Sequence, residues 1–315
     1  MKIVFMGTPD FAVGALEALV QAGHDILLVV TQPDRPKGRN SQPVFPPVKE
    51  CALKYHLPVF QPERIKRPEA VEELKKYQAD VFVVAAFGQI LSQEILDMPN
   101  QGCLNIHASL LPKYRGASPI QHVIIEGENT TGITVQMMNA GIDTGDILYS
   151  REISIDDTDN YETLHNKLMV LGGECIVETL EAMKQEKLSR TPQDDSQSSY
   201  APIIKKEMGE LDFSKRSEEI DRLIRGLTPW PSAYTFYKGK QLKIWNVKPQ
   251  QEDFIGAMPG EIVKVEKDCL VIACGKGSLI VYELQLEGKK RMSCHDFLLG
   301  VRVAPGEILG KWGSM

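Results

Sequence analysis

The sequence predicts an α/β fold, a Rossmann-like, mainly parallel sheet with helices on both faces, followed by a C-terminal OB-like β-barrel domain. Three observations predict this arrangement. Short apolar runs alternate with helical patterns in the first half, a polar segment then interrupts the chain, and short strand-like runs fill most of the remainder. A length of 315 residues also exceeds what a single core usually reaches.

The first half has the pattern of strands buried on both faces. Continuous apolar runs without alternation are typical of parallel strands covered by helices. We expect such strands at residues 2–6, 25–30, 81–86 and 103–109, with helices at 11–21 and 68–77. The runs at 133–138 and 147–154 are expected to extend the sheet as a pair. Residues 161–184 form one long amphipathic pattern, with Asp159 or Asn160 as its N-cap.

The polar segment at 188–206 is rich in Ser, Gln and Asp and has little apolar spacing, which is typical of a linker. It would join a catalytic domain at 1–187 to a C-terminal domain at 207–315. That second part contains a predicted helix at 212–227 and a closing helix at 293–300. Between them we expect strands at 233–237, 241–247, 260–266, 269–274 and 278–287. Five short strands after one helix suggest a small β-barrel.

Composition excludes several classes of protein. The net charge of −6 argues against a general nucleic-acid binder. Residues 205–315, however, carry 18 Lys+Arg against 15 Asp+Glu, whereas residues 1–204 carry 18 against 27. That distribution is compatible with a polyanion that docks on one part, and equally with an ordinary solvated surface.

Targeting and cysteine patterns point to a cytoplasmic protein. There is no apolar run long enough for a transmembrane helix, and the N-terminus lacks the apolar stretch and cleavage site of a signal peptide. The six cysteines form no CxxC pair and no zinc-finger spacing, so we expect neither disulfides nor a bound metal.

Asn105, His107 and Asp143 are the candidate catalytic residues. Strand alternation places Asn105 and His107 on one face, and two buried polar groups are costly unless they share a purpose. An amide can hold a developing oxyanion, an imidazole can handle a proton, and a carboxylate can orient the imidazole or relay that proton. The set suits acyl transfer onto an amine. The competing interpretations are a hydrogen-bonded core histidine and a carboxylate that only forms a turn.

Candidate ligand-binding segments follow the predicted strands, at the sheet edge where α/β proteins bind ligands. Gly7 stands without a GxGxxG pattern, so a dinucleotide is not expected. The segment at 31–49 contains five prolines and several basic residues, and its tip could reach a phosphate. Phe87 and Gly88 end another strand, where a flat heterocycle could approach the backbone. A solvated loop and a helix-initiating turn are the alternatives for these two segments.

Two long strings carry a specific resemblance. LNIHASLLPKYRG at 104–116 and GITVQMMNAGIDTGDIL at 132–148 resemble the folate-dependent formyltransferases. The strings GTPDFA, TQPDRPKGR, VVAAFGQIL and GLTPWPSAYT extend the resemblance over essentially the whole chain. They are most similar to the members of the family that formylate methionyl-tRNA.

The resemblance implies a set of site residues and ligands. Asn105, His107 and Asp143 would be the catalytic trio, and 10-formyltetrahydrofolate the co-substrate, with no metal. The folate site would be lined by Ser109, Leu110, Leu111, Pro112, Phe87 and Gly88. The partner would be initiator methionyl-tRNA, contacted by Arg35, Lys37, Arg39 and Arg115 and held by the C-terminal barrel of a monomeric enzyme. Two alternatives remain: formyl transfer to a small amine, such as a sugar nucleotide or glycinamide ribonucleotide, and folate or tRNA binding without catalysis.

Overall fold

The computed structural model describes residues 1–36 and 43–310, and the chain divides into two compact units. The first unit comprises Met1–Pro119, Thr130–Ser154 and Leu164–Pro202. The second comprises Ile120–Asn129, Ile155–Thr163 and the described residues from Ile203 onward. Two short segments that interrupt the first unit in sequence therefore belong to the second unit. None of the described helices has both the length and the apolar character needed to cross a bilayer.

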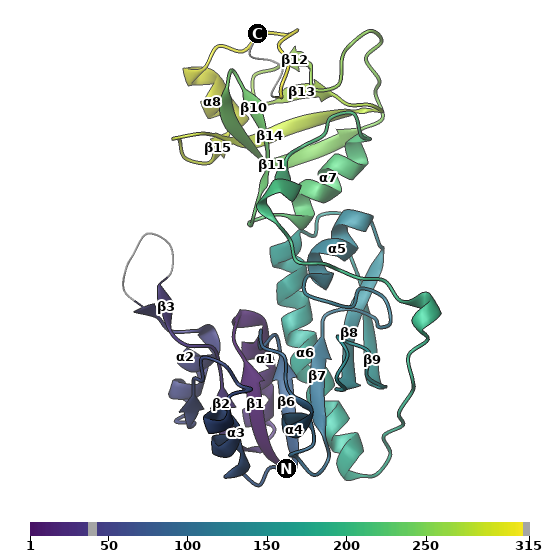
Figure 1. Cartoon of the computed structure of the whole chain (residues 1–315). Coiled ribbons are helices and arrows are strands. Elements are labelled where there is room, and N and C mark those ends of the chain that lie inside the picture. Colours follow the sequence, from purple (N-terminus) through teal and green to yellow (C-terminus); the bar gives the residue numbers. More distant parts are fainter. Residues whose placement is uncertain (37–42, 311–315) are drawn as a thin grey trace. The chain divides into compact units, whose positions relative to one another are not determined.

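A seven-stranded sheet forms the centre of the first unit in the described residues (Figure 1). Its order is β5-β2-β1-β6-β7-β8-β9, parallel from β5 to β7 and antiparallel at β8 and β9. The strands are β1 (Lys2–Gly7), β2 (Asp25–Val30), β5 (Val59–Phe60), β6 (Val81–Ala85), β7 (Cys103–His107), β8 (Thr130–Met137) and β9 (Ile147–Ser154). The predicted mainly parallel sheet with a paired extension is thus confirmed.

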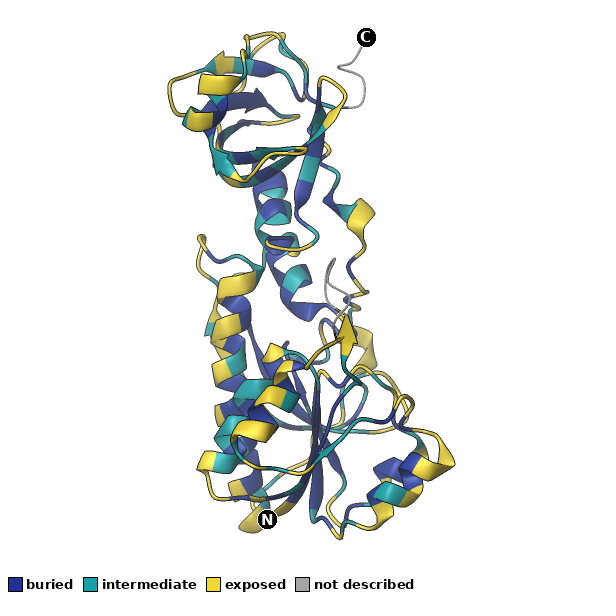
Figure 2. Ribbon diagram, turned by 90° about the vertical axis from the view of Figure 1, so that its left-hand side faces the viewer, coloured by how far each residue is buried: buried dark blue, intermediate teal, exposed yellow. Residues whose placement is uncertain are grey.

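Helices cover both faces of this sheet. They are α1 (Asp10–Gln21), α2 (Pro47–Lys54), α3 (Pro68–Lys75), α4 (Gln93–Leu96) and α6 (Tyr161–Lys184). Leu74 of α3 and Ile95 of α4 share a buried cluster with Phe82 and other strand residues on one face. On the opposite face, Gly172 of α6 lies against Ile106 of β7. Figure 2 shows the buried strands between helices that expose only their outer sides.

Glycines allow α1 and α6 to pack closely. A Cβ added at Gly14 would lie 2.6 Å from the carbonyl oxygen of Met169, and one at Gly173 would lie 2.8 Å from that of Gly14. Neither separation is possible for a real side chain. The predicted bounds of α6 agree with the structure, and Asn160 caps it, because its Oδ1 accepts a hydrogen bond from the Thr163 amide at 3.0 Å.

The second unit contains a mostly antiparallel sheet in the order β10-β11-β14-β13-β12, with β15 paired to β14. Its strands are β10 (Ala233–Tyr237), β11 (Lys240–Gln250), β12 (Ile262–Val265), β13 (Leu270–Ala273), β14 (Ser278–Leu286) and β15 (Met292–Ser293). Its helices are α5 (Pro119–Glu126), α7 (Ser217–Gly226) and α8 (Cys294–Gly300), with the short η2 turn (Lys206–Gly209). All five strands predicted for this part form, and α7 begins five residues later than predicted.

The C-terminal residues close this sheet into a barrel. Ile308 forms a bridge with Glu261 beside β12, and the Leu309 amide donates to the carbonyl of Gly260 at 2.8 Å. The Gly310 amide then donates to the carbonyl of Phe236 in β10 at 2.9 Å. The tail therefore joins the two edges of the sheet. Closure removes the exposed edges that would otherwise pair with other chains.

Candidate active site

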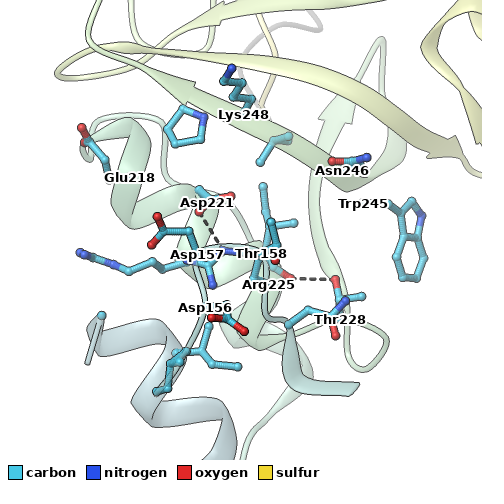
Figure 3. Close-up of a pocket in the computed structure, with 18 of the residues that line it drawn as sticks. Asp156, Asp157, Thr158, Glu218, Asp221, Arg225, Thr228, Trp245, Asn246 and Lys248 are labelled. Atoms are coloured by element: carbon cyan, nitrogen blue, oxygen red, sulfur yellow. Dashed lines mark hydrogen bonds and ion pairs between the residues drawn. The ribbon is translucent and has the colours of Figure 1, made fainter. Parts of the chain in front are cut away.

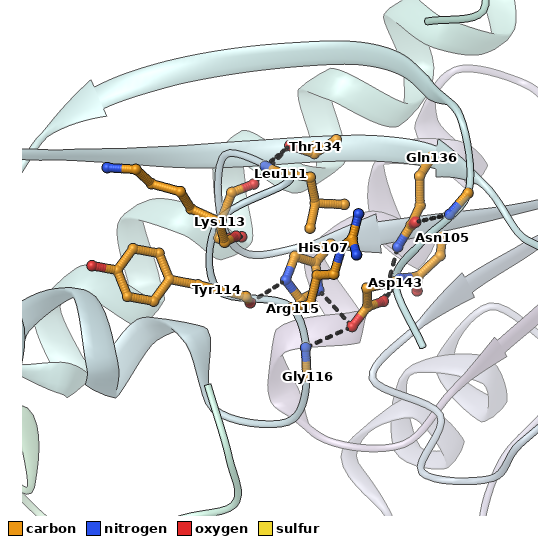
Figure 4. A network of polar contacts seen from close by, with 12 residues as sticks. Asn105, His107, Leu111, Lys113, Tyr114, Arg115, Gly116, Thr134, Gln136 and Asp143 are labelled. Carbon is orange, nitrogen blue, oxygen red and sulfur yellow. Dashed lines mark hydrogen bonds and ion pairs between the residues drawn. The ribbon is translucent and has the colours of Figure 1, made fainter. Parts of the chain in front are cut away.

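The pairing of β7 with β8 brings the first polar side chains of the site together (Figure 4). In this antiparallel pair Asn105 lies opposite Gln136, and His107 lies opposite Thr134. Directly opposed residues have neighbouring side chains on the same face of a sheet. The alternation predicted for Asn105 and His107 therefore extends to a second pair of polar residues on the adjacent strand.

Asp143 lies at the centre of this polar group (Figure 4). Its Oδ1 accepts from the side-chain amide of Gln136 at 2.8 Å and from that of Asn105 at 3.3 Å. Its Oδ2 accepts from the backbone amide of Gly116 at 2.9 Å. The structure thus brings together Asn105, His107 and Asp143, whose catalytic roles remain predictions.

His107 lies between two oxygen acceptors. Its Nε2 is 2.9 Å from the carbonyl oxygen of Tyr114, and its Nδ1 is 3.6 Å from Asp143 Oδ2. A carbonyl can only accept, so the hydrogen is assigned to Nε2 in the neutral ring, and Nδ1 faces the carboxylate. The side chains of His107 and Asp143 are 6% and 15% exposed, so the pair is largely shielded from solvent.

The turn that carries Asp143 requires glycine at a specific position. Asp143 adopts a left-handed conformation with φ of 53°. At Gly145 an added Cβ would lie only 1.6 Å from the carbonyl oxygen of Met137. The Gly145 amide donates to Gln136 Oε1 at 3.2 Å. This close return of the turn onto β8 sets where Asp143 lies.

The predicted folate-lining segment at 109–112 is held against β8 by Thr134. The Thr134 hydroxyl donates to the carbonyl of Ser109 at 2.7 Å and accepts from the Leu111 amide at 3.1 Å. Ser109 Oγ in turn donates to the carbonyl of Lys113 at 2.7 Å. Leu110 and Pro112 remain partly exposed, whereas Ser109 and Leu111 are buried. The segment is therefore a loop whose backbone is fixed by hydrogen bonds, directly after His107 in the sequence.

Phe87 and Gly88 lie at the carboxyl end of β6, as expected. The Phe87 side chain, however, is only 2% exposed and belongs to the buried cluster between the sheet and α3. Its carbonyl accepts from Thr8 Oγ1 at 3.0 Å and from Gln32 Nε2 at 3.2 Å. Gly88 is exposed, with φ of 80°. Any contact with a heterocycle at this point would therefore use Gly88 and the backbone.

The residues expected to contact tRNA are found in different settings. Lys37 and Arg39 lie outside the described residues. Arg35 begins the short strand β3 (Arg35–Pro36), which pairs with β4 (Pro43–Val44). Its side chain is 67% exposed and lies 3.6 Å from Glu63, so it is accessible to a phosphate.

Arg115 is buried, with 2% exposure, and its guanidinium contacts Gln193 and Asp195. Its guanidinium is buried and already bonded to these two side chains, which does not favour direct contact with tRNA. That contact stays a prediction.

Gln136, Thr134 and Gln193 belong to the site although sequence reasoning did not single them out. Gln136 and Thr134 interrupt an apolar strand at alternate positions, which is the same signal that identified Asn105 and His107. Gln193 lies in the segment predicted as a linker, where local sequence contains no such signal. Its side-chain amide donates to the carbonyls of Asp143 at 2.9 Å and Gly145 at 2.7 Å.

Cys103 lies two residues before Asn105 but has no chemical part in the site. Its thiol is buried against the carbonyls of Ile95 and Leu96, and burial raises its pKa to about 12. The thiolate is the reactive form. We therefore expect alkylation of Cys103 by N-ethylmaleimide at pH 8 to be about 10³-fold slower than in the denatured chain, measured by peptide mass spectrometry. Equal rates in native and denatured protein would contradict this burial.

A cleft of about 1030 Å³ lies within the second unit (Figure 3). Burial raises the pKa of Asp221 on its wall, although the Arg225 guanidinium, 2.9 Å away, opposes the shift. Acidic residues outnumber basic ones along its lining. The acidic residues are Glu128, Asp156, Asp157, Glu162, Glu218, Asp221 and Glu283, and the basic ones are Arg222, Arg225, Lys248 and Arg291. Such a lining repels phosphates, so this cleft is not the expected docking surface for a nucleic acid.

Comparison with known proteins identifies matches over both units. Residues 1–180 match the model of the formyl transferase family, and residues 203–302 match that of the formyl transferase C-terminal domain. A methionyl-tRNA formyltransferase of Geobacter sulfurreducens is 48% identical over 315 residues, which is 100% of this chain and 98% of that protein.

Two solved structures have a similar fold. An N-formyltransferase from Helicobacter canadensis, in complex with folinic acid and dTDP-3-aminofucose, has a TM-score of 0.68 at 21% identity and covers 93% of this chain and 100% of its own. HypX from Aquifex aeolicus, in complex with tetrahydrofolic acid, has a TM-score of 0.65 at 18% identity. The match covers 98% of this chain but only 49% of HypX, so the chain spans about half the length of that protein.

Proposed function

This chain belongs to the formyl transferase family, and we propose that it transfers the formyl group of 10-formyltetrahydrofolate to the α-amino group of methionyl-initiator tRNA. The observation that carries the proposal is full-length identity of 48% to a methionyl-tRNA formyltransferase, over both units. Two solved structures whose names indicate transfer to amino sugars share much less of the sequence, at 21–22% identity. The N-formyltransferase in complex with dTDP-3-aminofucose, for example, has a similar fold at 21% identity.

The transfer needs only groups that the site contains. The α-amine is partly deprotonated near neutral pH and attacks the formyl carbon, which forms a C–N bond and places negative charge on the formyl oxygen. Collapse of this tetrahedral intermediate breaks the bond between the formyl carbon and N10. The amine loses a proton and N10 gains one, so that N-formylmethionyl-tRNA and tetrahydrofolate are released.

Asn105 is the side chain best placed to stabilise the oxyanion. One N–H of its amide donates to Asp143, and no other hydrogen bond of that amide nitrogen is found among the described residues. The second N–H is therefore available to the formyl oxygen. One oxyanion donor typically contributes about 10²–10³-fold to the rate.

Asp143 and His107 would manage the proton. The Asp143 carboxylate accepts three hydrogen bonds from Asn105, Gln136 and Gly116, which fix its position. His107, with Nδ1 3.6 Å from that carboxylate, would share the proton that leaves the amine and pass it through water to N10. A protonated His107 would also help to stabilise the oxyanion.

Folate and tRNA would bind at different parts of the chain. We propose that residues 109–112 and Gly88 lie along the folate, since two relatives of this fold are complexed with folates. The basic segment around Arg35, Lys37 and Arg39 would contact the acceptor end of the tRNA. The C-terminal domain at 207–315 would hold the rest of the tRNA, joined through residues 188–206 to the catalytic domain at 1–187. The enzyme would act as a monomer in the cytoplasm.

A transfer assay tests this function. The purified chain is supplied with 10-formyltetrahydrofolate labelled in the formyl group, and with methionyl-initiator tRNA, methionyl-elongator tRNA or free methionine in separate reactions. We expect initiator tRNA to be formylated by a wide margin, with tRNA affinity falling as salt concentration rises. A dTDP-amino sugar and glycinamide ribonucleotide serve as competing acceptors. Faster transfer to either small amine would overturn the proposal.

A further inference from the structure

We infer that Gln193 and Arg115 are positioning residues for Asp143, so that the segment 191–201 is part of the catalytic machinery. This inference rests on the proposed formyl transfer. The segment leads from the catalytic domain toward the second unit, and its sequence alone suggests only a polar connection. In the structure its residues bond the turn at 143–145 and the loop at 114–115, all within the first unit.

The side-chain amide of Gln193 makes two hydrogen bonds as a donor and two as an acceptor, all within the site. Its Nε2 donates to the carbonyl of Asp143 at 2.9 Å and to that of Gly145 at 2.7 Å. Its Oε1 accepts from Arg115 Nε at 3.0 Å and from Arg115 Nη2 at 2.8 Å. One amide thus joins the turn that carries Asp143 to a buried guanidinium.

Arg115 is itself held firmly. Its side chain is 3% exposed, and Nη2 also lies 2.7 Å from Asp195 Oδ1. A planar guanidinium that makes two converging bonds to one amide oxygen and a third to a carboxylate has little freedom to rotate. Gln193 is consequently fixed in the orientation that points its two N–H groups toward residues 143 and 145.

The same segment also supports His107. The Arg115 amide donates to the carbonyl of Ser199 at 2.9 Å, and the Ala201 amide donates back to the carbonyl of Arg115 at 2.7 Å. The Tyr114 amide donates to Ser199 Oγ at 2.9 Å. These bonds fix residues 114–116, whose Tyr114 carbonyl binds His107 and whose Gly116 amide binds Asp143.

The backbone at Asp143 needs this support. A non-glycine residue with φ of 53° occupies a sparsely populated region and persists when its surroundings determine it. Gln193 binds the carbonyl of that residue directly. Loss of the two bonds would let the turn relax and move the carboxylate relative to Asn105 and His107. A displacement of about 1 Å in a catalytic group can lower a rate by roughly 10²-fold.

Two substitutions at Gln193 and one matched control test the inference. Gln193→Ala removes all bonds of the amide, whereas Gln193→Glu keeps an acceptor for Arg115 but removes both donated bonds. Gln197→Ala is the control, because Gln197 is exposed in the same segment and, among the described residues, its side chain bonds only Asp194. The kcat and both KM values for formyl transfer to methionyl-tRNA are measured for each variant.

We expect both Gln193 variants to lower kcat by roughly 10- to 100-fold, with KM values within about threefold of the unsubstituted chain. Gln197→Ala should retain full kcat. In an Asp143→Ala background, Gln193→Ala should cause no further loss, because its effect passes through Asp143. An unchanged kcat in Gln193→Glu would overturn the inference. So would a loss of kcat on adding Gln193→Ala to Asp143→Ala that equals its loss in the otherwise unsubstituted chain.

Amide hydrogen exchange separates this inference from the proposed function. In the Gln193 variants the peptides covering 137–147 should exchange faster than in the unsubstituted chain, and in Gln197→Ala they should not. Unchanged exchange in both Gln193 variants would count against the positioning role. If the unsubstituted chain transfers no formyl group to methionyl-tRNA, the proposed function fails, while the exchange of this turn still decides the role of Gln193.

Discussion

Asn105→Ala, His107→Ala and Asp143→Ala are each expected to lower kcat for formyl transfer by about 10²–10³-fold, with little change in the KM for tRNA. The three side chains meet in one small polar group, in which Asp143 accepts from Asn105 at 3.3 Å and lies 3.6 Å from His107. They would act on charge and protons that change only as the intermediate forms. Their removal should therefore affect turnover far more than binding. Steady-state kinetics with saturating folate measure the effect.

Matched substitutions in the second unit provide the control. Asn246→Ala removes an amide from an exposed position of the second unit, and His295→Ala removes an imidazole from a half-exposed one. Both should keep kcat close to that of the unsubstituted chain. Site variants that raise KM without lowering kcat would instead assign the trio to substrate binding. Variants that keep full turnover would remove it from the mechanism.

Gly145→Ala is expected to have the second largest effect, lowering kcat on the order of 10²-fold and destabilising the first unit by about 1–3 kcal/mol. The added methyl group would lie 1.6 Å from the carbonyl oxygen of Met137 in β8. The backbone at Gly145 cannot shift easily within its present contacts. Its amide donates to Gln136 and its carbonyl accepts from Gln193. The turn that carries Asp143 must therefore move away from β8.

Kinetics and thermal unfolding of the same preparations measure the two effects. Gly300→Ala is the control, since an added Cβ at Gly300 meets no atom within 4 Å. It should leave both kcat and the unfolding midpoint nearly unchanged. A Gly145→Ala protein with unaltered turnover would mean that the position of Asp143 does not depend on this close approach.

Short-range patterns predicted most of the fold. The parallel strands β1, β2 and β6 are nearly continuous apolar runs, and α6 keeps one apolar face over its 24 residues, so these elements follow from local periodicity. Elements that are too short to show a period of apolar residues were not predicted from the sequence. The strands β3, β4 and β5 have two residues each, and α4 has four, which is too short for a period to appear. The helix α5 was missed although its apolar residues are dense.

The sequence by itself determined the identity of the main strands and the shared face of Asn105 and His107, because strand alternation is a property of neighbouring residues. Only the tertiary structure decided which distant groups complete the site. The register of β8 against β7 placed Gln136 beside Asn105, and the segment after α6 placed Gln193 against a turn 50 residues earlier in the chain. Such contacts depend on how strands pair and segments dock, and no local period of the sequence encodes them.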